Sequence, residues 1–152
     1  MHAGDLTQPY GSVPTDTDAL EAVRLLVDHG LPGLLVVDPA GRPFAILPAS
    51  DVVRTLVPGC IQEDPVLAAV IDEPHADRLC RALAGRRLAG LLPRERPFLP
   101  AAAPDGSAME LAELMARTRS PLIAVVEGGA EGSGRLLGVV TANHLLERLL
   151  QA

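Results

Sequence analysis

Thr141 and Asp51 are the two residues of this sequence whose types and positions best suit the binding of a ligand. Each follows a short apolar run and lies at the predicted start of a helix. A hydroxyl at a helix start lies beside unpaired backbone N–H groups, which favour phosphate oxygens, and a carboxylate one turn on can accept hydrogen bonds from both hydroxyls of a ribose. The two residue types together therefore indicate a nucleotide-like ligand.

The elements that carry these two residues belong to an internal repeat. Residues 18–38 share a pattern with residues 107–127, at an offset of 89 positions. A longer glycine-rich turn, residues 128–134, then raises the offset to 93, so that residues 45–51 align with residues 138–144. A duplication of this length indicates a fold built from two copies of one unit.

Each copy is predicted to run helix, strand, strand, helix. Asp18 and Ser107 each precede a Glu by three residues, which is the spacing of a capping box, and Gly30 is a stop signal after the first helix. Near-continuous apolar runs follow, as expected of strands covered on both faces, and a tight turn joins each to a second strand. The expected strands and closing helices are residues 34–37, 44–47 and 50–57 in the first copy and 123–126, 136–140 and 142–150 in the second. The predicted fold class is α/β, with two pseudo-symmetric units that each contain a small sheet.

The first helix of each copy is expected to cover its sheet with an apolar face. Residues spaced three and four apart lie on one side of a helix, and this spacing selects the face. The residues expected on it are Ala19, Val23, Leu26 and Val27 in the first copy and Met109, Ala112 and Met115 or Ala116 in the second.

Length and composition exclude several classes of protein. The 152 residues are 48% hydrophobic, which is enough to fill a compact interior, and they carry a net charge of −6. Aromatic residues make up only 2%, so few side chains are available to stack on bases. The negative net charge argues against binding to a phosphate backbone, so a nucleic-acid partner is not expected. No apolar run approaches the roughly 18 residues of a membrane span, and the N-terminus does not resemble a signal peptide. We therefore expect a soluble, cytoplasmic chain without a membrane or nucleic-acid partner.

Residue types that could form a metal centre or a catalytic triad are present but scattered. Cys60 and Cys80 form no Cys-x-x-Cys pair, and the histidines share no ligand spacing. The Ser, His and Asp residues lack the elbow motif that would place a nucleophile beside a base. We expect no disulfide framework, no metal site and no catalytic residue.

Two motifs recur in the copies and carry a resemblance to a known family. The first motif is Gly30-Leu31-Pro32-Gly33-Leu34-Leu35-Val36-Val37-Asp38, and the second is Gly138-Val139-Val140-Thr141-Ala142-Asn143-His144, aligned with residues 45–51. They resemble Gly-h-Ser-Gly-Leu-Pro-Val-Val-Asp and Gly-h-h-Thr-x-x-Asp of the CBS domain, where h is apolar. Leading segments at residues 2–7 and 88–93 are also of the family's kind. Two such domains in tandem resemble a Bateman module.

The resemblance implies sites for an adenine nucleotide at the second motif of each copy. In the family the base lies between apolar residues near the strand ends, for which Gly33 and Leu122 are the candidates here. The first copy keeps Asp51 for the ribose but has Pro48 in place of the hydroxyl. Because a proline cannot donate a hydrogen bond, the first copy loses a side-chain contact to phosphate, for which Ser50 is a partial substitute.

The second copy departs from the family at the other member of the pair. It keeps Thr141 for the phosphate, but His144 takes the place of the carboxylate. A histidine can still donate to or accept from a ribose hydroxyl, and it favours an anionic ligand when protonated. The alternative is that Thr141 and Ser50 only cap their helices and that His144 is a surface residue.

Residues 60–86 are the part of the chain that the resemblance explains least. Pro65 and Pro74 each begin a helical-looking stretch, which predicts two short helices. One neighbourhood of the chain is basic and contains Arg86, Arg87, Arg94 and Arg96. It could contact a phosphate or the acidic surface of a partner, or its arginines could be ordinary surface residues of a solvated linker. We expect a first CBS domain at residues 1–59, a helical bridge at 60–86 and a second CBS domain at 87–152.

The resemblance implies a regulatory module without catalytic activity or a required cofactor. AMP, ADP, ATP, NAD or S-adenosylmethionine would bind in a cleft between the repeats and favour one arrangement of them. The alternative is a ligand-free module that pairs through exposed apolar helix faces, with the altered motifs as relics. A homodimer fits both hypotheses, and a separate regulated protein is the further expected partner. A hydrolytic enzyme is a third hypothesis, for which no nucleophile can be named.

Overall fold

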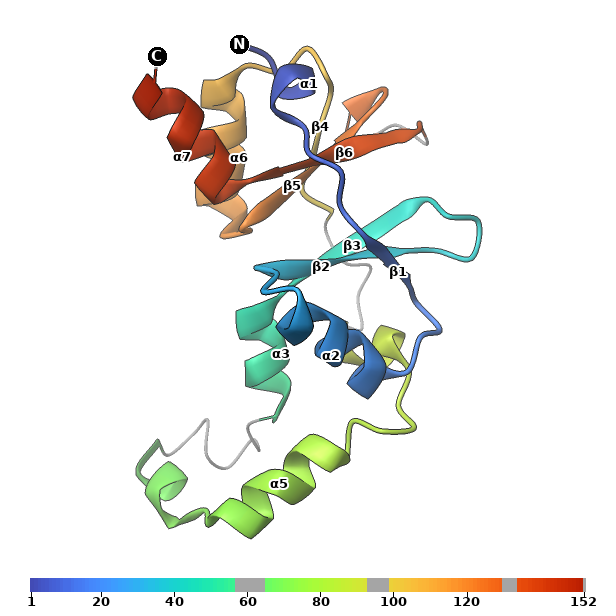
Figure 1. Ribbon diagram of the computed structural model, residues 1–152, viewed down its shortest axis with the longest axis vertical. Coiled ribbons are helices and arrows are strands. Elements are labelled where there is room, and N and C mark those ends of the chain that lie inside the picture. Colours follow the sequence, from blue (N-terminus) through green and yellow to red (C-terminus); the bar gives the residue numbers. More distant parts are fainter. Residues whose placement is uncertain (57–64, 93–98, 130–133, 152) are drawn as a thin grey trace.

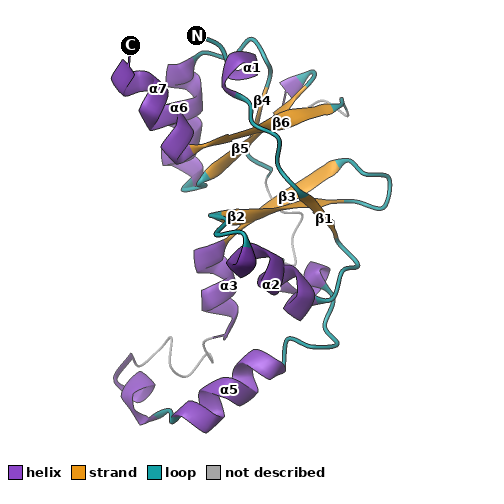
Figure 2. Cartoon of the chain, in the orientation of Figure 1, coloured by secondary structure: helices purple, strands orange, loops and turns teal. Residues whose placement is uncertain are grey.

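Two three-stranded sheets face each other across the middle of the molecule, with helices on their outer sides (Figures 1 and 2). The computed structural model describes residues 1–56, 65–92, 99–129 and 134–151. The first half contains β1 (Ser12–Pro14), α2 (Ala19–Asp28), β2 (Gly33–Val37), β3 (Pro43–Pro48) and α3 (Ala49–Leu56). The second half contains β4 (Ala101–Ala102), α6 (Ala108–Thr118), β5 (Leu122–Val126), β6 (Leu136–Thr141) and α7 (Ala142–Gln151).

The two sheets have the same topology and the same register. In each, the central strand pairs in parallel with the short first strand and antiparallel with the last. Ser12 lies opposite Leu35 in the first sheet, and Ala101 lies opposite Ala124 in the second, so both pairs obey the offset of 89. The predicted α/β repeat is therefore confirmed. The sequence did not predict β1 and β4, because three and two residues are too few to show a strand pattern.

The helix starts are capped as their spacing predicts. Asp18 accepts a hydrogen bond from the Glu21 N–H at 3.3 Å. Ser107 and Glu110 form a complete capping box, since the Ser107 N–H donates to Glu110 at 2.6 Å and the Glu110 N–H donates to the Ser107 hydroxyl at 3.2 Å. These contacts satisfy backbone donors that the first helical turn leaves unpaired.

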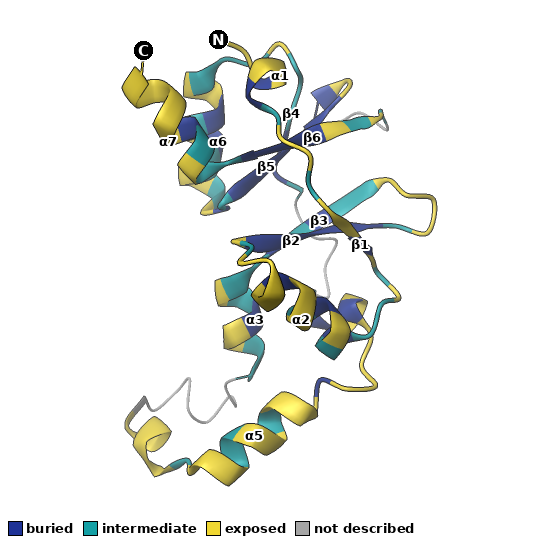
Figure 3. Ribbon diagram, in the orientation of Figure 1, coloured by how far each residue is buried: buried dark blue, intermediate teal, exposed yellow. Residues whose placement is uncertain are grey.

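The central strands are buried along their whole length, as their unbroken apolar runs predict (Figure 3). Leu34 and Val36 pack against the helices of their half, and Ile123 and Val125 do the same in the other half. The alternate residues of β5 turn the other way, where Ala124 lies in a cluster with Val126 and Ala101 that also receives Ile46 from β3. The two sheets therefore pack against each other directly.

The expected helix faces were partly wrong. Ala19 and Leu26 are buried in α2 as expected, but Val27 is 67% exposed and Ala22 is buried instead. In α6 Met109 is 71% exposed, while Leu111 and Leu114 face the core. Both helices carry apolar residues on more than one side, so spacing alone could not decide which side meets the sheet.

The leading segment of each copy packs on the other half. Helix α1 (Ala3–Leu6) places Leu6 in the core of the second half, and Gln8 exchanges two backbone hydrogen bonds with Val139 at 2.8 and 3.1 Å. The 3₁₀ helix η2 (Leu88–Leu91) places Leu88 in the core of the first half, where the Leu88 N–H donates to the Thr17 carbonyl at 2.8 Å. Each core is thus completed by a segment that precedes the other copy.

The bridge between the copies contains the two short helices that its prolines predict. They are η1 (Pro65–Val70), a 3₁₀ helix, and α5 (Glu73–Arg81), in which the Asp72 side chain accepts from the His75 N–H at 2.9 Å. No residue of α5 is buried, and the helix lies apart from both sheets (Figure 1). Cys60, Arg94 and Arg96 lie outside the described residues.

Candidate functional site

The first strand–helix junction joins the end of β3 to the start of α3 and brings together Gly33, Pro48, Ser50 and Asp51, which we call the first junction. Gly33 lies opposite Pro48 in the antiparallel pair. Ser50 and Asp51 follow in the first turn of α3. The Asp51 side chain is 44% exposed and lies 3.6 Å from the Arg54 guanidinium. The carboxylate is thus accessible and engaged in an ion pair of the weak, solvent-exposed kind.

The second junction joins β6 to α7 and brings together Leu122, Thr141 and His144. Leu122 lies opposite Thr141, as Gly33 lies opposite Pro48 in the first half. The Thr141 hydroxyl accepts from the His144 N–H at 3.1 Å, which is the hydrogen bond of a helix cap. The His144 imidazole is 22% exposed and its Nδ1 lies 3.7 Å from a Glu147 carboxylate oxygen. Thr141 therefore caps α7 and still has its own hydroxyl hydrogen to donate.

The two junctions lie on the same side of the molecule, where α3 and α7 begin (Figure 1). Because neighbouring residues of a strand point to opposite faces, Gly33 and Leu122 lie on the faces turned away from the helices. Those are the faces that the two sheets turn toward each other, as the contact of Ile46 with the Ala124 cluster shows. The ligand-binding role of these residues stays a prediction.

Two hydroxyls at the junctions were missed by the sequence analysis. The Tyr10 hydroxyl donates to the Gly33 carbonyl at 2.5 Å, and the Ser120 hydroxyl donates to the Leu122 carbonyl at 2.6 Å. Burial raises the pKa of Tyr10, and the bond to Gly33 lowers it by less. Tyr10 is the one tyrosine of the chain, which was the available signal.

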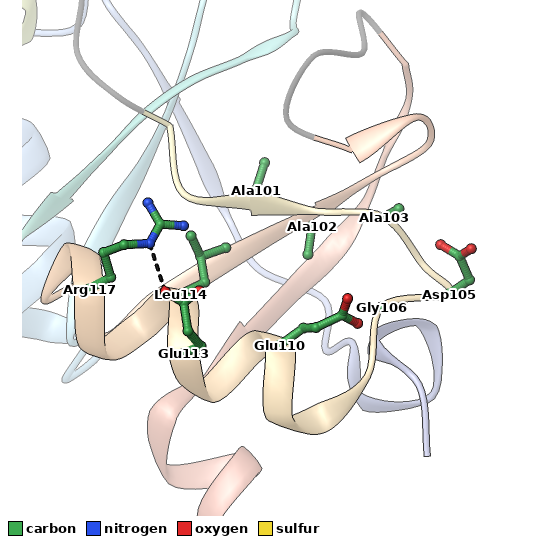
Figure 4. Close-up of a pocket in the computed structure, with 9 residues that line it drawn as sticks. All are labelled: Ala101, Ala102, Ala103, Asp105, Gly106, Glu110, Glu113, Leu114 and Arg117. Atoms are coloured by element: carbon green, nitrogen blue, oxygen red, sulfur yellow. Dashed lines mark hydrogen bonds and ion pairs between the residues drawn. The ribbon is translucent and has the colours of Figure 1, made fainter.

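A pocket of about 420 Å³ lies elsewhere in the second half, between β4, the loop that follows it and α6 (Figure 4). Glu113 and Arg117 form an ion pair at its rim, with atoms 2.8 Å apart. The hydrogen bonds from Ser107 hold the pKa of Glu110 below its usual value. The lining residues are Ala101, Ala102, Ala103, Asp105, Gly106, Glu110, Glu113, Leu114 and Arg117, and they include no residue of either junction.

Three further expectations from the sequence concern metal sites, membrane spans and basic residues in the described segments. They contain no group of three His, Cys, Asp or Glu side chains placed to hold a metal ion. None of their helices is both long and apolar enough to cross a membrane. In the predicted basic neighbourhood, the Arg86 guanidinium donates a hydrogen bond to the Gly90 carbonyl at 3.3 Å, so it has a partner within the chain.

The repeated unit with its junctions matches the model of one protein family. The CBS domain model matches residues 3–58 and again residues 95–151. The chain belongs to the CBS domain family. Proteins that consist of CBS domains alone are generally regulatory modules. A search of curated proteins finds no match to this CBS pair.

Solved structures support the same assignment. A CBS domain-containing protein of unknown function from Kribbella flavida is 45% identical, with a TM-score of 0.77 and 99% of each chain covered. The CBS domain of a membrane protein from Sphaerobacter thermophilus is 29% identical, with a TM-score of 0.65, over 96% of this chain and 86% of that one. CBSX2 of Arabidopsis thaliana, solved in complex with AMP, is 18% identical with a TM-score of 0.68, over 99% of this chain and 96% of that one. The last similarity shows a shared fold.

Proposed function

We propose that this CBS pair is a non-catalytic regulatory module that binds an adenine nucleotide or a related adenosyl ligand in a cleft between its repeats. The observation that carries the proposal is the position of Thr141, whose hydroxyl caps α7 at a strand end opposite Leu122. The exposed carboxylate of Asp51, in the first turn of α3 at the repeat position of His144, adds to it. CBSX2, which shares the fold, was solved with AMP, and this supports the choice of ligand.

The second junction can hold a nucleotide without a change of its own hydrogen bonds. Thr141 accepts from the His144 N–H and donates its hydroxyl hydrogen to a phosphate oxygen. His144, partly exposed at the start of the same helix, donates to or accepts from a ribose hydroxyl. If a ligand also entered the first junction, Asp51 would accept hydrogen bonds from its ribose hydroxyls, in competition with Arg54.

Binding would regulate a partner by favouring one arrangement of the two halves. The halves touch through the two sheets and through the exchanged leading segments. A ligand that contacts one arrangement better than another shifts the population by the difference in its affinities. A partner protein that recognises the favoured arrangement then responds to the ligand concentration.

A thermal-shift panel of AMP, ADP, ATP, NAD and S-adenosylmethionine tests the proposal. A ligand at about 100 times its dissociation constant adds about 2.7 kcal/mol to the free energy of unfolding. For a chain of this size that corresponds to a rise of roughly 5 to 10 °C in melting temperature. If none of the five ligands raises the melting temperature, the proposal is wrong in its adenosyl form.

Two variants locate the ligand, and a third is their control. Thr141→Val removes the hydroxyl and should abolish the ligand-induced shift at the second junction, and Asp51→Asn tests the first. Thr118→Val is the matched control, because the Thr118 hydroxyl donates to the Leu114 carbonyl within α6 and belongs to neither junction. The quantity compared is the ligand-induced shift, since each substitution also changes the melting temperature of the unliganded protein. An unchanged shift in both junction variants would show that the ligand binds elsewhere.

A second function, ligand-free pairing with another copy, is favoured by one observation. Val53 on α3 and Leu146 on α7 occupy equivalent places in the repeat and are 59% and 56% exposed. Two apolar faces related by an approximate two-fold axis suit a symmetric contact. If this surface forms a dimer, sedimentation velocity should show a monomer for the double variant Val53→Lys/Leu146→Lys. Met109→Lys, at an exposed methionine of α6, is the control that should leave the association state unchanged.

A further inference from the structure

We propose that Tyr10 closes the first junction to ligand, so that the module binds its nucleotide through the second junction alone. This inference rests on the proposed function and adds which of the two junctions the ligand uses.

The Tyr10 hydroxyl donates a hydrogen bond to the backbone carbonyl of Gly33, the first residue of β2. Strand β1 begins at Ser12, opposite Leu35, so Tyr10 lies two residues before the ladder and Gly33 two residues before its partner. The Gly33 carbonyl therefore lies just outside the parallel ladder, and the Tyr10 hydroxyl donates to it at 2.5 Å. The burial that raises the pKa of Tyr10 agrees with a phenol held against the protein.

The resemblance to the family implies that a base bound at the first junction would lie against Gly33. A Cβ added at Gly33 would lie 3.0 Å from the Leu47 carbonyl oxygen and 3.2 Å from the Pro48 Cα, so the strand pair is closely packed at this point. Pro48 donates no hydrogen bond. A ligand that needs the Gly33 carbonyl must first displace Tyr10, and the loss of one such bond corresponds to about tenfold weaker binding.

Among the described residues, no side chain of the leading segment of the second half donates to the Leu122 carbonyl as Tyr10 donates to the Gly33 carbonyl. By the offset of 89 the counterpart of Tyr10 is Leu99, which packs against the cluster of Ala101, Ala124 and Val126. The Leu122 carbonyl is bonded by Ser120, which belongs to the turn just before β5. The carbonyl is thus satisfied locally, and Thr141 keeps its hydroxyl hydrogen for a ligand.

Tyr10 is held in place from both sides. Two residues before it, Gln8 exchanges two backbone hydrogen bonds with Val139 of the second half, and two residues after it, Ser12 begins β1. A rigid segment between two anchored points costs little further entropy to keep in position. The Tyr10 side chain is therefore held at the first junction in the absence of a ligand, and its removal should open that junction.

Isothermal titration with AMP tests the inference through stoichiometry. The wild-type chain should bind one AMP per chain, and Thr141→Val should abolish that binding. Tyr10→Ala should bind two, and the added event should disappear in Tyr10→Ala/Asp51→Asn. Tyr10→Leu, which installs the residue type of the second half, should also bind two and serves if Tyr10→Ala fails to fold, as judged by circular dichroism.

Fluorescence gives a second readout, because Tyr10 is the one tyrosine and the chain contains no tryptophan. Saturating AMP should leave the Tyr10 emission of the wild type unchanged. Two bound AMP molecules in the wild type, one in both Tyr10 variants, or quenching of Tyr10 by AMP would overturn the inference while the proposed function stands. If neither the wild type nor the Tyr10 variants bind any nucleotide of the panel, the proposed function and the inference fail together.

Discussion

At the residue scale, the two junctions differ in the polar groups that the protein already uses. Thr141 both caps a helix and retains a donor, whereas the first junction has Pro48 and a carbonyl bonded by Tyr10. The sequence placed the candidate residues correctly at strand ends and helix starts. It could not separate a capping hydroxyl from a ligand-binding one, because both need the same residue at the same place. It also could not show that Tyr10 bonds to Gly33, because the two residues lie 23 positions apart.

The stability of the protein at alkaline pH should depend on Tyr10. Because its folded pKa is raised, the unfolded chain releases this proton first above about pH 10, and the free energy of unfolding then falls as pH rises through the folded pKa. Below that pH the contribution is complete. Urea unfolding between pH 8 and 11 should show a shallower decline for Tyr10→Phe than for the wild type. The chain has no lysine, so few other groups titrate there, and identical slopes would show that Tyr10 is not perturbed.

At the element scale, the doubling of the sequence made most of the fold predictable. Asp18 and Ser107 gave the helix starts, and the apolar runs gave the central strands, because each signal occurs twice at one offset. The helix faces were harder, and Val27 and Met109 were assigned to the core wrongly. Local spacing predicts whether a segment is a helix or a strand better than it predicts which residues of that segment face the core.

The ends of α2 and α6 provide a matched pair of substitutions. Gly30 after α2 has φ 59°, and its repeat counterpart Arg119 after α6 has φ 54°, a left-handed conformation that costs a non-glycine residue about 1 kcal/mol. Arg119→Gly should therefore raise the free energy of unfolding by up to about 1 kcal/mol, less the entropy that glycine loses. Gly30→Ala should lower it by about the same amount, since a Cβ there meets nothing within 4 Å and only the backbone matters. Chemical denaturation measures both, and changes of the same sign would contradict this account.

At the scale of the whole molecule, the exchange of leading segments is the feature that local sequence signals could not reveal. Leu6 precedes the first copy but completes the core of the second half, and Leu88 does the reverse. The apolar character of both segments was visible, but nothing in their order along the chain tells which sheet each one covers. The pairing is non-local, and only packing decides it.

Substitution of Leu6 should destabilise the second half, and substitution of Leu88 should destabilise the first. Leu6→Ala and Leu88→Ala each remove a fully buried side chain and should each cost roughly 2 to 5 kcal/mol. Hydrogen exchange should speed up first in residues 101–151 for Leu6→Ala and in residues 12–56 for Leu88→Ala. Val70→Ala, at a 74% exposed position of η1, is the control and should change stability by less than about 0.5 kcal/mol. Faster hydrogen exchange in the half that lies next to the substituted residue in the sequence would contradict the crossed packing of the two segments.

The crossed segments also bear on how such a protein could arise. A polypeptide with a single copy could pack its leading segment only on a second molecule. The stability of its core would therefore depend on protein concentration. Fusion of two such copies places both segments on one polypeptide. In the fused polypeptide each segment and the surface it packs on are covalently linked, so the packing of each half does not depend on protein concentration.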